Sequence, residues 1–445
     1  MPGPFVVPVH GDSELPQKVD VVVIGGGIIG VSTALELVEA GKSVAICEKG
    51  GIGHEQSSRN WGWVRVARRD PREIDLVIEA QKLWRDLNRR TGRDTGYRQT
   101  GIVFTAQNEK ELADHEAWLK HLDGRGVDCR IMGKPEFDQR FSSSAMKRAG
   151  ALLCMDDGRA EPQMAAPAIA ERARELGAHI LTECAVRGIE TTNGAVSSVV
   201  TERGVIECDA VVLAGGAWSE MFLRSMRKGL HLPQLKVKNS VLRTTPMSGG
   251  PEEALWSDNF AVRKREDGGY TIASGHGNIA DITPASFRYF MDFIPALKVE
   301  WKNLMLRFGW RFFDEARMDA YWKLDQPSPF EFARVLDPKP SQKLVDDSLR
   351  LAIAAFPGLK GAKIAQTWAG YIDALPDAIP VMDSVPEVPG FFVATGFSGH
   401  GFGIGPGAGK LMADLVLGRP PVVSTQAFRL KRFVDGTKIE LITGY

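Results

Sequence analysis

The sequence predicts an α/β chain in which a nucleotide-binding sheet and a second α+β domain are built from interleaved segments. A β-branched run, a glycine turn and an amphipathic helix open the chain at residues 19–39, and glycine turns also follow apolar strands at 210–219 and 391–403. Strand-rich sequence at 237–274 suits a separate sheet. The length of 445 residues is enough for two or three structural units.

The opening segment has the order of a βαβ unit. Residues 19–24 form a continuous apolar run, as in buried parallel strands. Gly25-Gly26-Gly27 then turns the chain into a helix over 28–39, and a second strand over 43–47 ends at Glu48. This arrangement predicts a Rossmann-type dinucleotide site.

Each glycine of the pattern G-x-G-x-x-G has its own task. Gly25 makes the tight turn, Gly27 leaves room for a pyrophosphate, and Gly30 allows close packing of helix on strand. The helix start at Ile28 and Ile29 offers free N–H groups to the phosphates. Glu48, followed by Lys49, is placed to accept hydrogen bonds from ribose hydroxyls and argues against a 2′-phosphate.

FAD and NAD share this fingerprint, so other segments must distinguish them. The loop 51–62 is rich in glycine and hydroxyl groups and would continue along the pyrophosphate towards a flavin. Residues 211–219 form an apolar strand that opens into a Gly-Gly turn, which lets backbone approach a ligand closely. Residues 396–403 open a glycine-rich loop that runs to Gly409 and precedes a helix over 410–416, and N–H groups here suit the negative charge of a reduced flavin.

With these motifs the chain resembles the D-amino-acid oxidase/sarcosine oxidase superfamily of FAD-dependent amine oxidoreductases, which includes glycine oxidases and bacterial D-amino-acid dehydrogenases. The likeness rests on VVVIGGGIIG, SSRNWG, VVLAGGAWS, and the late pair TWAGYIDALPDAIPVMD and ATGFSGHGFGIGP. It implies FAD across the first domain and oxidation of an amine or amino-acid C–N bond. The hydride passes to flavin N5 and the imine hydrolyses in water, without need of a dedicated acid–base pair.

The resemblance and the motifs together assign the cofactor site. The expected FAD-binding residues are Gly25, Gly27, Ile28, Ile29, Gly30, Glu48, Lys49, Ser57, Ser58, Asn60, Trp61, Gly62, Val186, Ala214, Gly215, Trp218, Gly370, Gly399, His400, Gly401 and Phe402.

FAD is expected to be bound noncovalently. Some members of the superfamily attach flavin through a late cysteine, and this sequence has none after Cys208. Others use a histidine near the SSRNWG loop, where this chain has Arg59. His54 lies a few residues away, and attachment through it stays open as the alternative to a polar loop residue.

Substrate recognition departs from one family pattern and matches another. Many relatives that oxidise amino acids carry Arg-Pro shortly after the W-x-G that here is Trp368-Ala369-Gly370, and this chain has Ile372-Asp373 instead. Sarcosine oxidases have R-x-x-R after the flavin loop, matched by Arg65-x-x-Arg68. A guanidinium holds a carboxylate through two hydrogen bonds. A surface arginine cluster with Arg69 and Arg72 is the alternative.

Three further residues complete the expected site. Trp368 is a candidate for substrate binding, and Tyr371 and His400 are candidates for ordering substrate or flavin. For His400, a capping role in a tight glycine loop is the alternative.

A dehydrogenase is favoured over an oxidase. Sarcosine oxidases place a lysine over the flavin in a strand that corresponds to YTIASG at 270–275, which contains none. The electron acceptor is then a quinone, an electron-transfer protein or O2. The alternatives are an NAD-linked dehydrogenase and a flavin-bearing subunit of an electron-transfer or opine-oxidase-like complex with little activity alone.

Composition narrows the partners and the setting. Basic and acidic residues balance at 55 each, which removes the case for nucleic-acid binding. The five cysteines show neither zinc-site spacing nor a disulfide framework, so we expect reduced thiols and no metal. No signal peptide or membrane-spanning run is visible. A cytoplasmic protein is expected, with peripheral contact with the inner face of a membrane and oligomer formation left open.

The motifs also predict domain limits. Residues 1–85, 145–225 and 350–435 are assigned to a discontinuous FAD-binding domain, and 86–144 and 226–349 to the substrate domain. The stretch at about 284–335 is rich in aromatic and basic residues and is expected to be a helical insertion.

Overall fold

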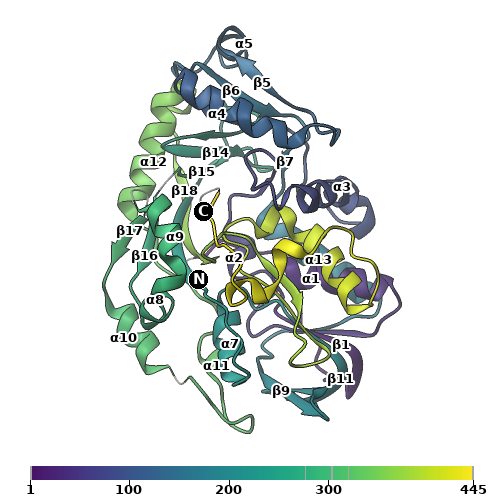
Figure 1. Ribbon diagram of the computed structural model, residues 1–445. Helices are drawn as coiled ribbons and strands as arrows, with labels where there is room; N and C mark the ends of the chain where they lie inside the picture. Colours follow the sequence, from purple (N-terminus) through teal and green to yellow (C-terminus); the bar gives the residue numbers. More distant parts are fainter. Residues whose placement is uncertain (1–2, 276, 302–303, 319, 443–445) are drawn as a thin grey trace.

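The computed structural model describes residues 3–275, 277–301, 304–318 and 320–442. Two large sheets organise the chain, and segments far apart in sequence meet in each of them (Figure 1). The predicted fold class, α/β with a Rossmann-type domain and a second α+β unit, is confirmed.

The first sheet has a parallel centre. Its strands are β1 (Lys18–Ile24), β2 (Val44–Cys47), β8 (His179–Leu181), β9 (Val186–Thr192), β10 (Ala195–Thr201), β11 (Gly204–Leu213), β19 (Val381–Ser384) and β20 (Phe391–Thr395). The order is β19-β20-β11-β1-β2-β8, and β20, β11, β1, β2 and β8 run parallel. The carboxyl ends of β1 and β11 therefore lie side by side, where a Rossmann-type sheet binds its ligand.

Helices cover one face of this sheet. They are α1 (Ile28–Glu39), α3 (Ile74–Thr91), α6 (Pro162–Glu175) and α13 (Gly401–Val416), and α1 packs on both α6 and α13. The sequence predicted that the last helix begins at Lys410, but it begins at Gly401. Its glycines explain the difference: a Cβ on Gly405 would lie 2.7 Å from Ile28 and one on Gly409 would lie 2.5 Å from Ser32. These weak helix formers are needed for close packing of α13 on α1.

The second sheet is mixed and has its own core. It contains β4 (Ile102–Ala106), β5 (Cys129–Gly133), β6 (Gly150–Cys154), β12 (Leu235–Thr244), β13 (Ala254–Ser257), β14 (Phe260–Lys264), β15 (Tyr270–Ser274), β16 (Asn278–Asp281), β17 (Leu304–Arg307) and β18 (Ile364–Ala374). One face packs on α12 (Gln342–Ala355), and α4 (Glu109–Leu119) and α5 (Lys134–Arg140) cover the end that holds β5 and β6. The opposite face looks towards the first sheet.

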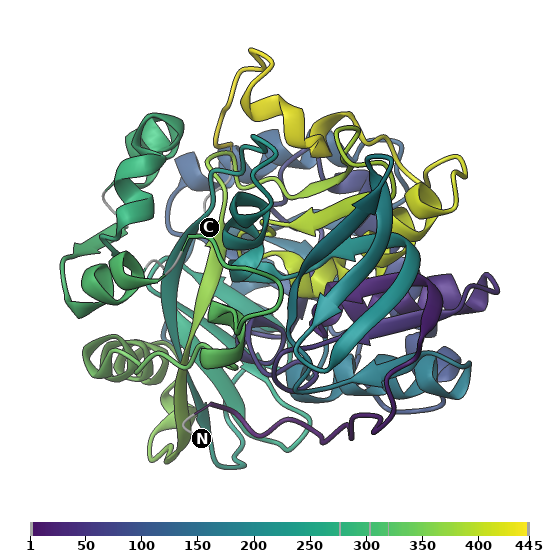
Figure 2. The same cartoon turned by 90° about the horizontal axis from the view of Figure 1, so that it is seen from below.

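Shorter elements join the two sheets. They are α2 (Gln56–Arg59), α7 (Ser219–Ser225), and the two-stranded pair of β3 (Trp63–Val64) with β7 (Gly158–Arg159). The N-terminal arm runs along the molecule and reaches the second sheet (Figure 2), where Gln366 Nε2 donates a hydrogen bond to the carbonyl of Gly3.

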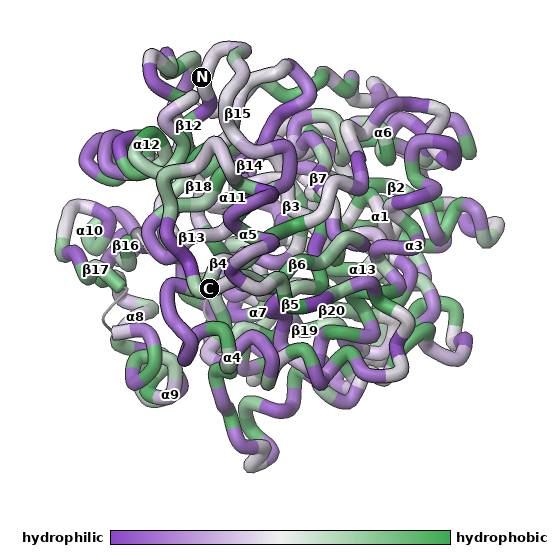
Figure 3. Tube along the Cα trace, turned by 90° about the horizontal axis from the view of Figure 1, so that it is seen from above, coloured by the Kyte–Doolittle hydropathy of each residue, from purple (hydrophilic) through white to green (hydrophobic). Residues whose placement is uncertain are grey.

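Residues 284–335 contain α8 (Pro284–Arg288), α9 (Phe290–Glu300), β17, α10 (Trp310–Arg317) and α11 (Pro329–Phe332). The segment from α8 to α10 lies at the β16–β17 edge of the second sheet, set apart from the rest of the chain (Figure 3). The sequence-based domain limits stay a prediction. We note that β6 and β18 lie inside segments assigned to the FAD-binding domain but pair with the second sheet.

One expectation about the cysteines is wrong. Cys129 on β5 and Cys154 on β6 are directly opposed, with Cα atoms 3.9 Å apart, and form a disulfide. Cys47, Cys184 and Cys208 are free and buried. The two cysteines are 25 residues apart in sequence. Their pairing depends on the register of β5 against β6, which the spacing of cysteines in the sequence does not reveal.

Candidate functional site

A cavity of about 560 Å³ lies between the two sheets. Every predicted motif contributes to its wall: the turn at Gly25, the loop 51–61, the Gly215 turn, Gly370 on β18, and the loop that leads into α13. The fold therefore brings together five segments that are spread over residues 25–403 of the sequence.

Most of the predicted site residues line this cavity. They are Gly25, Gly27, Ile28, Ile29, Glu48, Lys49, Ser57, Asn60, Trp61, Arg65, Arg68, Val186, Ala214, Gly215, Trp218, Gly370, Tyr371, Gly399, His400, Gly401 and Phe402. Gly30, Ser58, Gly62 and Trp368 are not part of the wall.

The glycine turn has the predicted geometry. Gly25 adopts φ 109°, a conformation that favours glycine. Gly30 has no room for a side chain, because a Cβ there would collide with the carbonyl of Gly25. Its role is thus the packing of α1 on β1, while Gly25 and Gly27 leave backbone open to the cavity.

Acidic and hydroxyl groups at this end are already ordered by backbone N–H groups. Glu48 accepts hydrogen bonds from the N–H of Gly26 and of Gly50, both at 2.7 Å, and burial raises the pKa of its carboxyl group. Ser57 Oγ accepts from the N–H of Ile28 at 2.8 Å. The Lys49 ammonium already has partners within the protein. It forms an ion pair with Glu55 at 2.7 Å and lies 4.7 Å from the ring centre of Trp218.

These residues fit FAD. Bare glycine backbone, the start of α1, the ordered Glu48 carboxylate and the start of α13 all line the cavity. Such positions are used to bind phosphates, ribose hydroxyls and a negatively charged ring.

Asp373 on β18 holds the glycine-rich loop that leads into α13. It occupies the place where many relatives have Arg-Pro. Its Oδ2 accepts hydrogen bonds from the N–H groups of Gly396 (2.9 Å) and Phe397 (3.3 Å). Burial raises the pKa of Asp373 to about 6. The departure from the family pattern therefore has a structural role, namely to tie β18 to the loop before α13.

His400 directly precedes α13 and faces Glu73. Its Nδ1 lies 3.4 Å from a carboxylate oxygen of Glu73, and both side chains are buried. Burial raises the pKa of Glu73 to about 7. Sequence reasoning missed Glu73, because nothing in its local pattern distinguishes it from a surface glutamate.

The arginines after the flavin loop lie in different surroundings. Arg65, Arg68 and Arg69 line the cavity, whereas Arg72 forms an ion pair with Asp70 at 2.7 Å. No ion pair of the described residues includes the first three arginines. Burial and the charge of Arg69 lower the pKa of Arg65 well below its usual value. Arg65 is therefore a cavity-facing cation and not part of a surface cluster.

Arg65 lies against aromatic side chains, and the nearby carboxylate of Asp157 is occupied elsewhere. The guanidinium carbon of Arg65 is 5.2 Å from the ring centre of Phe104. Asp157 accepts hydrogen bonds from the N–H of Val66 at 2.6 Å and from Gln81 at 2.7 Å. A ligand carboxylate would supply the ion-pair partner that Arg65 lacks among the described residues.

Trp368 requires a correction. It is 1% exposed and lies behind the cavity wall, where its indole N–H donates to the carbonyl of Arg59 at 3.0 Å. Its size and burial suit a support for Arg59 and Trp61 rather than a substrate contact. Tyr371, by contrast, lines the cavity, with the Arg311 guanidinium carbon 4.0 Å from its ring centre.

Six aromatic residues of the wall were missed, and three of them lie beside Trp61. Trp63, Phe104 and Trp256 line the cavity beside Trp61. In sequence, Phe104 and Trp256 look like ordinary strand residues, and only the pairing of β4 with β13 brings them together.

Comparisons with known proteins show which proteins this chain resembles. The structure of L-amino acid deaminase from Proteus myxofaciens in complex with anthranilate has a TM-score of 0.92 and 33% identity, with 96% of each chain covered. Glycine oxidase of Bacillus licheniformis is 25% identical over 94% of this chain and 98% of its own length. Mitochondrial sarcosine dehydrogenase of Mus musculus is 24% identical over 97% of this chain, which spans only 43% of that protein.

In the described part of the chain, no helix has the length and apolar character needed to cross a membrane. A family model described as FAD dependent oxidoreductase matches residues 20–415, which include all the motif segments of the cavity wall. The chain therefore belongs to the family of FAD dependent oxidoreductases, and FAD is its cofactor.

Proposed function

We propose that this chain oxidises the C–N bond of an amino acid whose carboxylate is held by Arg65. The observation that carries the proposal is a cation in the cavity wall, close to the start of α13, that has no ion-pair partner among the described residues. The names of the relatives support the class, since they act on sarcosine, glycine and L-amino acids.

The residues divide the work between binding and orientation. The Gly25–Gly27 turn, Glu48 and Gly215 bind the dinucleotide, and the loop at Gly399–Phe402 holds the flavin end. When bound, FAD accepts the hydride and its two electrons at flavin N5. Arg65 orients the substrate so that its Cα–H faces the flavin, and the imine released after oxidation hydrolyses to a carbonyl compound and an amine. Binding geometry supplies most of the rate, without a dedicated acid–base pair.

We further propose a dehydrogenase with noncovalent FAD. Within the described residues, Lys49 is the single lysine of the cavity wall, and its ammonium is bound by Glu55. The sequence has no cysteine after Cys208, and Nδ1 of His400 faces the carboxylate of Glu73 at 3.4 Å. His54 also lines the cavity, and burial lowers the pKa of its imidazole.

The test is an anaerobic titration of the purified yellow protein with both enantiomers of several amino acids. We expect the flavin absorbance to bleach and a 2-oxo acid and ammonia to form in equal amounts. Reoxidation should be faster with an artificial quinone than with O2. Acid precipitation should leave the yellow colour in the supernatant; colour in the pellet would show a covalent link, and a flavin that no amine or amino acid reduces would overturn the proposed reaction.

A further inference from the structure

Four aromatic side chains form a continuous surface at one end of the cavity. We call Trp61, Trp63, Phe104 and Trp256 the aromatic wall. Trp61 and Trp63 follow α2, whereas Phe104 and Trp256 stand on the neighbouring strands β4 and β13. The wall is thus made jointly by the segment that follows the flavin loop and by the second sheet.

The rings pack against one another in a fixed arrangement. Phe104 and Trp256 are register partners, with ring centres 6.0 Å apart and planes 19° from parallel. The ring centre of Trp256 lies 5.6 Å from that of Trp61 and 6.4 Å from that of Trp63. On the other face of the same strands, Val103 and Leu255 are buried in the separate core beneath α12. The strand alternation therefore directs aromatic side chains to the cavity and aliphatic ones away from it.

The aromatic wall adjoins the proposed carboxylate anchor. Phe104 stacks on Trp256 and also carries the Arg65 guanidinium over its ring. An amino acid whose carboxylate is bound by Arg65 would thus have its carboxylate end next to the aromatic wall. The indole N–H of Trp63 is buried and has no hydrogen-bond partner in the described part of the chain.

We propose that the aromatic wall binds the substrate side chain and selects amino acids with a planar apolar side chain over those of glycine or alanine size. The proposal rests on the proposed function. Aromatic faces in a cavity gain most from planar apolar partners, which remove ring surface from water and stack on it. A small side chain would leave the aromatic rings in contact with water. The site therefore distinguishes substrates by the area of the aromatic wall that their side chains cover.

The test compares phenylalanine with alanine on the holoenzyme, using the reactive enantiomer and anaerobic flavin reduction. Full burial of a large apolar side chain predicts a preference of roughly 10- to 100-fold in kcat/KM for phenylalanine. Trp256→Leu should reduce this preference, measured as the ratio of the two kcat/KM values, by about tenfold, whereas Trp256→Phe should keep most of it. The matched control is Trp310→Leu, a tryptophan that is 78% exposed and outside the cavity wall; it should leave the preference unchanged.

A binding measurement keeps the inference separate from the proposed reaction. The nonreactive pair 3-phenylpropionate and propionate is titrated into the oxidised enzyme, and the flavin spectrum reports binding. We expect tighter binding of the phenyl compound, lost in Trp256→Leu. If no amino acid reduces the flavin but this difference is found, the proposed reaction fails and the aromatic wall stands. Equal binding of both acids, or an effect of Trp256→Leu confined to reoxidation by a quinone, would overturn the inference.

Discussion

The two ends of the cavity are built from different materials. At the dinucleotide end, glycine backbone and helix starts form the wall, and the polar side chains of Glu48, Ser57 and Lys49 already have protein partners. At the other end, side chains form the wall: cations without ion-pair partners among the described residues, and aromatic rings. The difference fits the proposed roles, in which one end holds a cofactor that stays bound and the other receives a substrate that is exchanged at each turnover.

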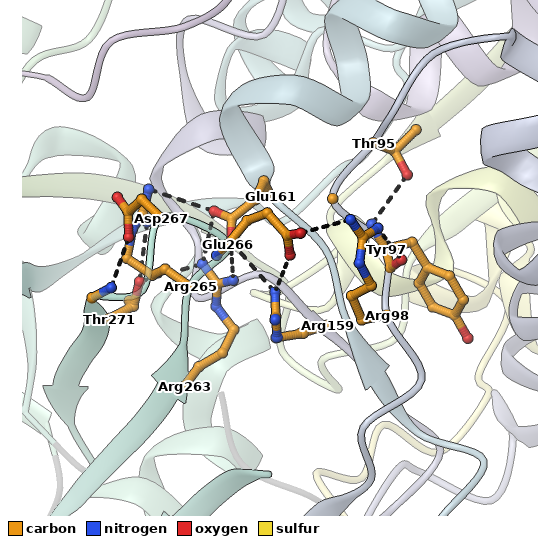
Figure 4. A network of polar contacts seen from close by, with 12 residues as sticks. Thr95, Tyr97, Arg98, Arg159, Glu161, Arg263, Arg265, Glu266, Asp267 and Thr271 are labelled. Carbon is orange, nitrogen blue, oxygen red and sulfur yellow. Dashed lines mark hydrogen bonds and ion pairs between the residues drawn. The ribbon is translucent and has the colours of Figure 1, made fainter. Parts of the chain in front are cut away.

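The largest expected effect comes from breaking a buried ion pair that joins the start of α6 to the second sheet. Glu161 before α6 and Arg263 on β14 form a buried ion pair at 2.7 Å, which Arg265 and Arg159 extend (Figure 4). Glu161→Gln leaves Arg263 uncompensated and should cost about 3–5 kcal/mol of unfolding free energy. Urea unfolding measures it. The control is Glu175→Gln on the same helix, where the ion pair with Arg93 is exposed and its loss should change the unfolding free energy far less.

The same pair predicts an acid limit. The arginines hold the pKa of Glu161 at about 2 although burial acts in the opposite direction. A carboxyl whose pKa is lower in the folded state contributes stability above its unfolded pKa and loses it as the pH falls through the folded value. Stability should therefore decline from about pH 4.5 towards pH 2, and less steeply in Glu161→Gln. A parallel decline in both proteins would contradict this assignment.

The substrate end is tested by Arg65→Met. Loss of a two-point contact with a carboxylate should cost roughly 2–4 kcal/mol in transition-state binding, or on the order of a hundredfold in kcat/KM. The matching amine, which lacks the carboxylate, should be insensitive. Arg68→Met and Arg72→Met serve as comparisons, and the FAD content must be normal in all of them. Equal losses on the amino acid and the amine would assign Arg65 to the flavin or the fold.

The dinucleotide end is tested by Glu48→Ala. Removal of a charged acceptor for ribose hydroxyls should weaken FAD binding by about 1.5–3 kcal/mol. Titration of the apoprotein with FAD gives the affinity. The melting temperature of the apoprotein reports any destabilisation from loss of the hydrogen bonds that Gly26 and Gly50 donate to Glu48. Glu39→Ala, whose carboxylate pairs with Arg90 on the surface, is the control. An unchanged FAD affinity would remove Glu48 from the cofactor site.

The smallest expected effect concerns the pair of Glu73 and His400. Burial raises the pKa of Glu73 to about 7, so its carboxyl favours folding most below about pH 4.5 and loses this contribution as the pH rises through 7. Glu73→Gln should flatten the dependence of unfolding free energy on pH in this window. It should also shift the pH profile of flavin reduction. A profile identical to that of the unchanged protein would leave Glu73 without a role at the site.

The sequence predicted one end of the cavity far better than the other. Gly25, Gly27, Glu48 and Gly215 follow from local rules, because a turn or a helix start has the same requirement wherever it occurs. Phe104 and Trp256 meet only through the pairing of β4 with β13, and Cys129 meets Cys154 through that of β5 with β6. Such contacts depend on strand register, which no local pattern specifies.

Residue type also misled where packing decides the outcome. Trp368 was expected at the substrate, but its ring is behind the wall. The glycines of 401–409 were interpreted as a loop, yet they are helical, because α13 must approach α1 closely. Asp373 shows the converse: a departure from a family motif acquired a clear role only when its backbone partners were visible.

The contact of Gly405 and Gly409 with α1 has a mechanical consequence. Gly405 lies against the side chain of Ile28, and Gly409 lies against the backbone of Ser32. Because of this close packing, α13 has little freedom to slide or tilt on α1 without steric overlap. The start of α1 and the start of α13, which both line the cavity, are therefore held at a fixed distance from each other. Any hinge that admits substrate must then act on the side of the second sheet, where Phe104 and Trp256 would travel with it.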